Sequence, residues 1–158
     1  LAHAEIVALS RLSKNGHNMA DYTLYTTLEP CPMCLGAMAM AEIRQVRFAA
    51  RDGWAGSAAL AQATPYLAGK KINLFWEGSS LELFQLALST AFELRRNHPR
   101  KEVLLRSWSA HCPEGVLVGK HLYKEGFFAA AREQGLKVEQ VYGAVLENYA
   151  RKAWVEEE

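Results

Sequence analysis

The chain has little cysteine, and its 158 residues carry a formal net charge of only +1. Three cysteines are too few for a secreted disulfide framework, which favours a reducing cytoplasm. No stretch approaches the roughly 18 uninterrupted apolar residues of a membrane span. A near-neutral total also lacks the basic excess that is typical of nucleic-acid-binding domains. We therefore expect a soluble, cytoplasmic protein with a single core.

Residues with metal-binding side chains lie in two short segments, His-Ala-Glu at 3–5 and Pro-Cys-Pro-Met-Cys at 30–34. Cys31 and Cys34 are three apart, so on a helix they share one face, and Pro32 suits its first turn. The positive end of the helix dipole favours the thiolates that bind metal. Taken alone, the cysteine pair would also fit a redox site or buried core residues.

His3 adds an imidazole to the two thiolates, and Glu5 is a carboxylate that need not be a ligand. Three protein ligands with a fourth position left for water are typical of catalytic zinc, which lowers the pKa of that water toward about 7. Glu5 would then transfer the water's proton to a substrate. The pattern predicts hydrolysis by a zinc-bound hydroxide.

His-x-Glu followed by Pro-Cys-x-x-Cys resembles the signature of the zinc-dependent cytidine and deoxycytidylate deaminase superfamily. Residues 24–38, Leu-Tyr-Thr-Thr-Leu-Glu-Pro-Cys-Pro-Met-Cys-Leu-Gly-Ala-Met, resemble the branch that contains tRNA-specific adenosine deaminases and guanine deaminases. Residues 46–52 and the Ala-Gly-Ser at 55–57 are similar to the tRNA adenosine deaminases, with a shorter loop between them. The resemblance extends over about the first 95 residues.

The resemblance implies one Zn²⁺ per chain on His3, Cys31 and Cys34, with Glu5 as the proton shuttle. It implies a hydrolase acting on C–N bonds of cyclic amidines, which removes an exocyclic amine from a nucleobase, a nucleoside or a tRNA adenosine. It also implies a homodimer. The base attacked stays open, and the alternative is a catalytically inactive zinc-binding structural or RNA-binding protein of the same fold. The residues expected to contact substrate are Ala4, Leu28, Glu29, Asp52 and Trp54.

Two parts of the chain depart from that family. The His-x-Glu motif lies at the very start, so we expect that a preceding helix and strand pair are missing. A segment of about 60 residues follows residue 96. The basic cluster at 95–101, where this segment begins, predicts either a solvated helix end or an RNA contact. Cys112 is expected in a turn, as a free thiol.

The hydrophobic pattern predicts a three-layer α/β/α cytidine deaminase-like sandwich with a mixed sheet and a C-terminal helical extension. We place a deaminase core at 1–96 and the extension, packed on the same domain, at 97–158. Residues 53–69 are expected to be a loop with one helical turn. Strands are expected at 23–27, 46–50 and 71–76, and helices at about 3–13, 32–43, 81–96, 120–134 and 138–154.

Overall fold

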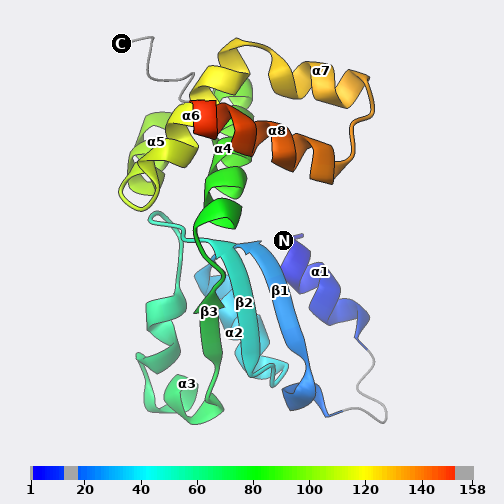
Figure 1. Ribbon diagram of the computed structural model, residues 1–158. Coiled ribbons are helices and arrows are strands. Elements are labelled where there is room, and N and C mark those ends of the chain that lie inside the picture. Colours follow the sequence, from blue (N-terminus) through cyan, green and yellow to red (C-terminus); the bar gives the residue numbers. More distant parts are fainter. Residues whose placement is uncertain (1, 13–17, 152–158) are drawn as a thin grey trace. The chain divides into compact units, whose positions relative to one another are not determined.

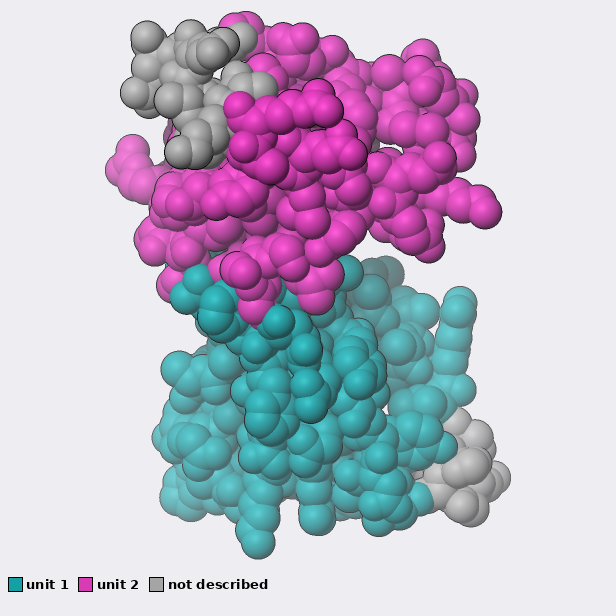
Figure 2. Space-filling view, in the orientation of Figure 1, with its two compact units in different colours: residues 1–77 teal, residues 78–158 magenta. Residues whose placement is uncertain are grey.

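The structure is a computed structural model that describes residues 2–12 and 18–151 (Figure 1). Its internal contacts divide the chain into two compact units, residues 1–77 and residues 78–158 (Figure 2). The sequence predicts a different boundary, at residue 96, between the deaminase core and the C-terminal extension. That boundary stays a prediction. Among the described residues, no helix is both long enough and apolar enough to cross a bilayer.

The first unit is built on a three-stranded parallel sheet with the strand order β1-β2-β3. The strands are β1 (Thr23–Leu28), β2 (Gln45–Ala50) and β3 (Asn73–Trp76). Parallel neighbours need crossover connections, and helix α2 supplies the one between β1 and β2. The three strands that the sequence predicts are confirmed within two residues at each end. The expected sheet was mixed, but the three described strands are all parallel, and no antiparallel strand is found among the described residues.

One face of this sheet is covered by α1 (Ala4–Arg11) and α2 (Pro32–Met40). Their core includes Met38 and Val46, both with no exposed surface. α2 begins at Pro32, whose missing N–H costs nothing in a first turn. Four residues of α2 are buried in this core, namely Cys34, Leu35, Met38 and Ala39. The predicted α/β class of a cytidine deaminase-like fold is confirmed.

The opposite face of the sheet is lined by Tyr25, Arg47 and Phe75, which lie side by side in register on the three strands. Tyr25 is 73% exposed and Phe75 is 43% exposed. The Arg47 guanidinium lies over the Phe75 ring, with its central carbon 5.2 Å from the ring centroid. This face is therefore solvent-accessible and partly aromatic, unlike the helix-covered face.

The second unit is entirely helical in its described part. α4 packs along α6, and the close approach depends on two glycines one turn apart, Gly115 and Gly119. A Cβ on Gly119 would lie 2.6 Å from the Ala87 carbonyl oxygen, closer than any tolerable contact. The helices are α4 (Ser79–Arg96), α5 (Lys101–Ser109), α6 (Pro113–Lys124), α7 (Phe127–Glu133) and α8 (Val138–Arg151).

One expectation about this region was wrong. The single helix predicted at 120–134 is two helices, because Gly126 takes a left-handed backbone (φ 70°) that ends α6 and starts α7. Cys112 directly follows the turn at 110–111 and is the buried N-cap residue of α6, and it forms no disulfide. The basic cluster at 95–101 includes the end of α4 at Arg96, in agreement with the predicted helix end, and the start of α5 at Lys101.

The remaining predicted elements agree with the structure in kind. α4 begins two residues earlier than expected and ends at Arg96 as predicted. The expected loop at 53–69 contains the 3-10 turn Ala58–Gln62 and the short helix α3 (Pro65–Lys70). The last helix follows the predicted pattern to Arg151, and the rest of its predicted length, at 152–154, lies outside the described residues.

Candidate metal centre

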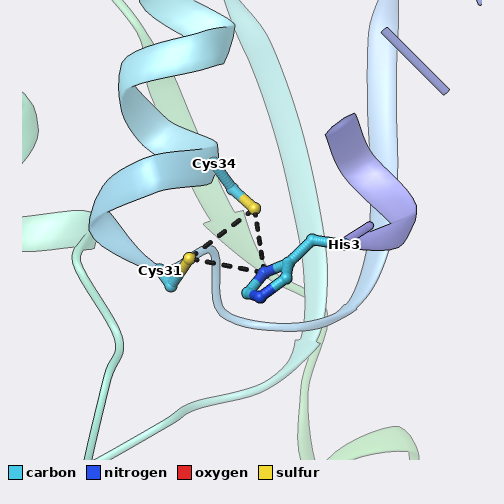
Figure 3. Close-up of side chains that lie close together, drawn as sticks. All are labelled: His3, Cys31 and Cys34. Carbon is cyan, nitrogen blue, oxygen red and sulfur yellow. Dashed lines mark hydrogen bonds between the residues drawn. The ribbon is translucent and has the colours of Figure 1, made fainter. Parts of the chain in front are cut away.

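His3, Cys31 and Cys34 bring their side chains together at one point of the first unit (Figure 3). The His3 Nδ1 atom lies 3.5 Å from the Cys31 sulfur and 3.4 Å from the Cys34 sulfur, and the two sulfurs are 3.6 Å apart. Tetrahedral zinc with ordinary bond lengths would place its sulfur ligands about 3.8 Å apart and a sulfur and a nitrogen about 3.6 Å apart. The donor set and its spacing therefore fit one zinc ion.

Two helix starts position these three ligands. Cys31 is the N-cap residue of α2 and Cys34 lies one turn further on, so both sulfurs point the same way (Figure 3). His3 is the N-cap residue of α1, with extended backbone, and its ring reaches across toward the sulfurs. The turn before Cys31 is fixed by Ser57, whose hydroxyl and N–H both donate to the Pro30 carbonyl, at 2.6 and 3.0 Å.

Glu5 lies beside this triangle and is held by a second residue. Its Oε1 atom accepts a hydrogen bond of 2.6 Å from the Thr26 hydroxyl, which also lies 3.3 Å from the Leu28 carbonyl oxygen. Its Oε2 atom accepts from the Cys34 thiol at 3.5 Å. One oxygen of the carboxylate is therefore anchored to the sheet while the other faces the metal ligands. This role of Thr26, which lies on the helix-covered face of β1, was not predicted from the sequence.

Burial raises the pKa of the Cys34 thiol to about 12 in the absence of a cation. The hydrogen bond with Cys31 and the negative charge of Glu5 act in the same direction. Cys34 therefore keeps its proton at neutral pH until a cation replaces it, since metal ligation requires the thiolate. Loss of that proton also removes the donor to Glu5 Oε2, which frees this oxygen for another partner.

The loop after β2 is tied to the same region by Glu29. The two oxygens of this carboxylate accept backbone N–H bonds from Asp52, at 3.2 Å, and from Ala58, at 2.9 Å. Gly56 is required by this arrangement, because a Cβ there would lie 2.5 Å from the Glu29 carboxylate. The structure thus gives Glu29 a role in positioning the loop.

The other residues expected to contact a substrate differ in their exposure to solvent. Asp52 accepts the backbone N–H of Trp54 at 3.0 Å, which shapes the turn, and the Trp54 side chain is 49% exposed. Ala4 is exposed at the start of α1, and Leu28 is half-buried at the end of β1. Contact with a substrate stays a prediction for these four residues and for Glu29.

Comparison with known families bears directly on this geometry. Residues 1–50 match the model of the cytidine and deoxycytidylate deaminase zinc-binding region, and this segment includes all three ligands and Glu5. Residues 1–50 are therefore similar to a deaminase zinc-binding region. The single zinc predicted from the sequence is therefore confirmed by the family match and by the His-Cys-Cys group together.

Relatives of this deaminase region include a tRNA-specific adenosine deaminase of Haemophilus influenzae, which is 39% identical over 114 residues, or 68% of this chain and 65% of the relative. A guanine deaminase of Bacillus subtilis is 33% identical over 106 residues, or 64% of this chain and 66% of the relative. The chain thus spans slightly under two thirds of these relatives. They confirm the branch of the superfamily predicted from the sequence. No solved structure matches the chain.

Proposed function

We propose that the protein is a hydrolytic deaminase that removes an exocyclic amine from a nucleobase, a nucleoside or a tRNA adenosine. The observation that carries this proposal is the Glu5 carboxylate, which lies against the His-Cys-Cys group but is anchored by Thr26 rather than recruited as a further ligand. A structural zinc site would have a fourth protein ligand. Relatives named for adenosine and guanine deamination support the same chemistry.

In this mechanism zinc, when bound, supplies a water molecule acidic enough to act near neutral pH. Glu5 accepts a proton from that water at Oε2, the oxygen not engaged by Thr26, and delivers it to a ring nitrogen as the water oxygen adds to the ring carbon. Glu5 then takes the second proton from the added hydroxyl group and delivers it to the amine, which departs as ammonia while the carbonyl forms. Thr26 holds the carboxylate in one orientation during both transfers. Such positioned proton transfer typically accelerates a reaction by about 10² to 10⁴.

The loop fixed by Glu29 supports the assignment of a ring-shaped substrate. It carries the exposed Trp54 indole close in sequence to Asp52 and Gly56, on a backbone held by two hydrogen bonds to one carboxylate. An aromatic side chain on a rigid loop can stack on a purine or pyrimidine at a small entropic cost. We therefore include Ala4, Leu28, Asp52 and Trp54 in the proposed substrate site.

Ammonia release tests this proposal. Adenosine, guanine, cytosine, cytidine and a tRNA anticodon stem-loop would be incubated with the zinc-loaded wild type and with Glu5→Gln, a variant of the same size that cannot take up the proton. We expect release from at least one substrate by the wild type and a loss of at least about 10²-fold in Glu5→Gln. One zinc per chain with no ammonia from any substrate would favour the inactive zinc-binding alternative.

A homodimer and a cytoplasmic location complete the proposal. None of Cys31, Cys34 and Cys112, all within the described residues, is in a disulfide, which supports a reducing compartment. Light scattering coupled to size exclusion would test the oligomeric state, and a monomer at micromolar concentration would contradict it. Fractionation of the source cells would test the location.

A further inference from the structure

The second unit contains a cavity of about 560 Å³ that is separate from the metal ligands and is not used by the proposed reaction. α4, the end of α6, α7 and the start of α8 form its walls, with α7 and α8 joined as a hairpin (Figure 1). This volume is within the range of small-molecule sites, about 300 to 1,000 Å³. Most of its lining is apolar and includes Leu88, Phe92, Tyr123, Phe128, Leu136 and Val141.

The walls of this cavity are fixed by backbone structure. Gly126 and Gly135 both line it and both take left-handed conformations, at φ 70° and 65°, which turn the chain before and after α7. The Leu136 N–H donates to the Ala131 carbonyl at 2.9 Å, closing the end of α7. The cavity therefore exists before any ligand arrives, which lowers the entropic cost of filling it.

The polar groups of the cavity share one sign of charge. Arg95 and Arg132 line it and both residues are exposed, whereas no acidic residue lines it. Arg95 lies over the Phe92 ring, its central guanidinium carbon 5.8 Å from the ring centroid. Within the described part of the chain, neither arginine has an ion-pair partner. The neighbouring Arg96, by contrast, lies 3.4 Å from a Glu93 oxygen.

We propose that this cavity binds an anion with an apolar body, specifically an aromatic or acyl carboxylate. The apolar body would replace water against the aromatic and aliphatic lining, and the carboxylate would receive paired N–H bonds from a guanidinium. A nucleic-acid strand fits less well, because it needs cations along an extended groove rather than two beside an apolar cavity. The proposal is independent of deamination, since the residues involved all lie in the second unit.

Calorimetric titration of the full zinc-loaded chain tests the site with naphthalene-2-carboxylate, decanoate and the neutral naphthalene-2-methanol. We expect both carboxylates to bind at one site per chain and the alcohol to bind at least about tenfold more weakly, because it lacks the charged hydrogen bonds. Equal affinity for the acid and the alcohol would overturn the proposed role of the arginines.

Two pairs of variants locate the binding. Ala129→Trp fills the cavity and should abolish binding, whereas Ala130→Trp, also exposed on α7 but outside the lining, should retain it. The double variant of Arg95→Gln and Arg132→Gln should weaken carboxylate binding at least about tenfold and leave the alcohol unchanged. The double variant of Arg100→Gln and Arg106→Gln, at α5 and outside the lining, is the charge-matched control and should bind as the wild type does.

Several results would overturn the proposal. They are equal losses in the two tryptophan variants, unchanged affinity in the double arginine variant, and no binding of either carboxylate at millimolar concentration. Displacement of the carboxylate by oligouridylate at lower concentration than by decanoate would assign the surface to nucleic acid instead. Circular dichroism of each variant confirms that its helices are intact before the comparison is made.

Discussion

Replacement of Thr26 by valine should slow the proposed reaction without loss of zinc. Valine has the shape of threonine but cannot donate the 2.6 Å hydrogen bond to Glu5 Oε1. A hydrogen bond to a charged group contributes about 1.5 to 3 kcal/mol, and we take about 1 to 2 kcal/mol here because both side chains are only part-buried. At about 1.4 kcal/mol per tenfold change, this corresponds to a fall in kcat of roughly 5- to 30-fold.

The assay is steady-state ammonia release with the substrate that the wild type turns over best. Because Thr26 acts through Glu5 and does not touch the substrate, the loss should fall on kcat and leave KM within about twofold. Thr26→Ser restores the donor and should recover most of the rate. Zinc content should stay close to that of the wild type, and the free energy of unfolding should fall by no more than about 1 to 2 kcal/mol, the contribution of the lost hydrogen bond.

Thr27→Val is the matched control, because Thr27 lies on the exposed side of the same strand, away from Glu5. It should behave as the wild type does. Two results would refute the reasoning: an unchanged kcat in Thr26→Val when Glu5→Gln is inactive, or equal losses in the serine and valine variants. The second result would show that the methyl group of Thr26, rather than its hydroxyl, matters.

Three further predictions concern the metal, the loop and the helical unit. Removal of zinc by a chelator should lower the free energy of unfolding by about 4 kcal/mol if the free zinc concentration had been near 1,000 times Kd. Cys34→Ser should leave the zinc content, measured by plasma emission, well below one ion per chain. Glu29→Ala should lower the free energy of unfolding by about 2 kcal/mol and speed hydrogen exchange at the backbone amides of Asp52 and Ala58, which donate to the Glu29 carboxylate. Unchanged exchange at these two amides would contradict the positioning role of Glu29. Gly119→Ala should destabilise the protein by about 1 to 3 kcal/mol in urea unfolding, because the added Cβ meets α4. Gly143→Ala, in α8 with nothing within 4 Å, should stabilise by about 0.5 to 1 kcal/mol, so a shift of the same sign in both would contradict the packing argument.

Most of the first unit's elements could be predicted because their signals are local. The strands at 23–28 and 45–50 show β-branched and aromatic residues, and α2 follows a proline that fits a first turn. The helical unit was harder, since the apolar pattern that predicts one helix at 120–134 conceals a break at Gly126. Periodicity reports which face is apolar, but it does not report where a single glycine turns the chain.

The sequence by itself was enough to predict the group of His3, Cys31 and Cys34 and the proposed proton carrier Glu5. An imidazole, two thiols three residues apart at a helix start, and a nearby carboxylate have their chemistry in the side chains and their spacing in the local helix geometry. Only the tertiary structure decided what holds them in place, because Thr26 meets Glu5 across 21 positions and Ser57 meets the Pro30 carbonyl across 27. The cavity lined by Arg95 and Arg132 was also decided by the tertiary structure alone, since helices that are distant in sequence must pack together before it exists.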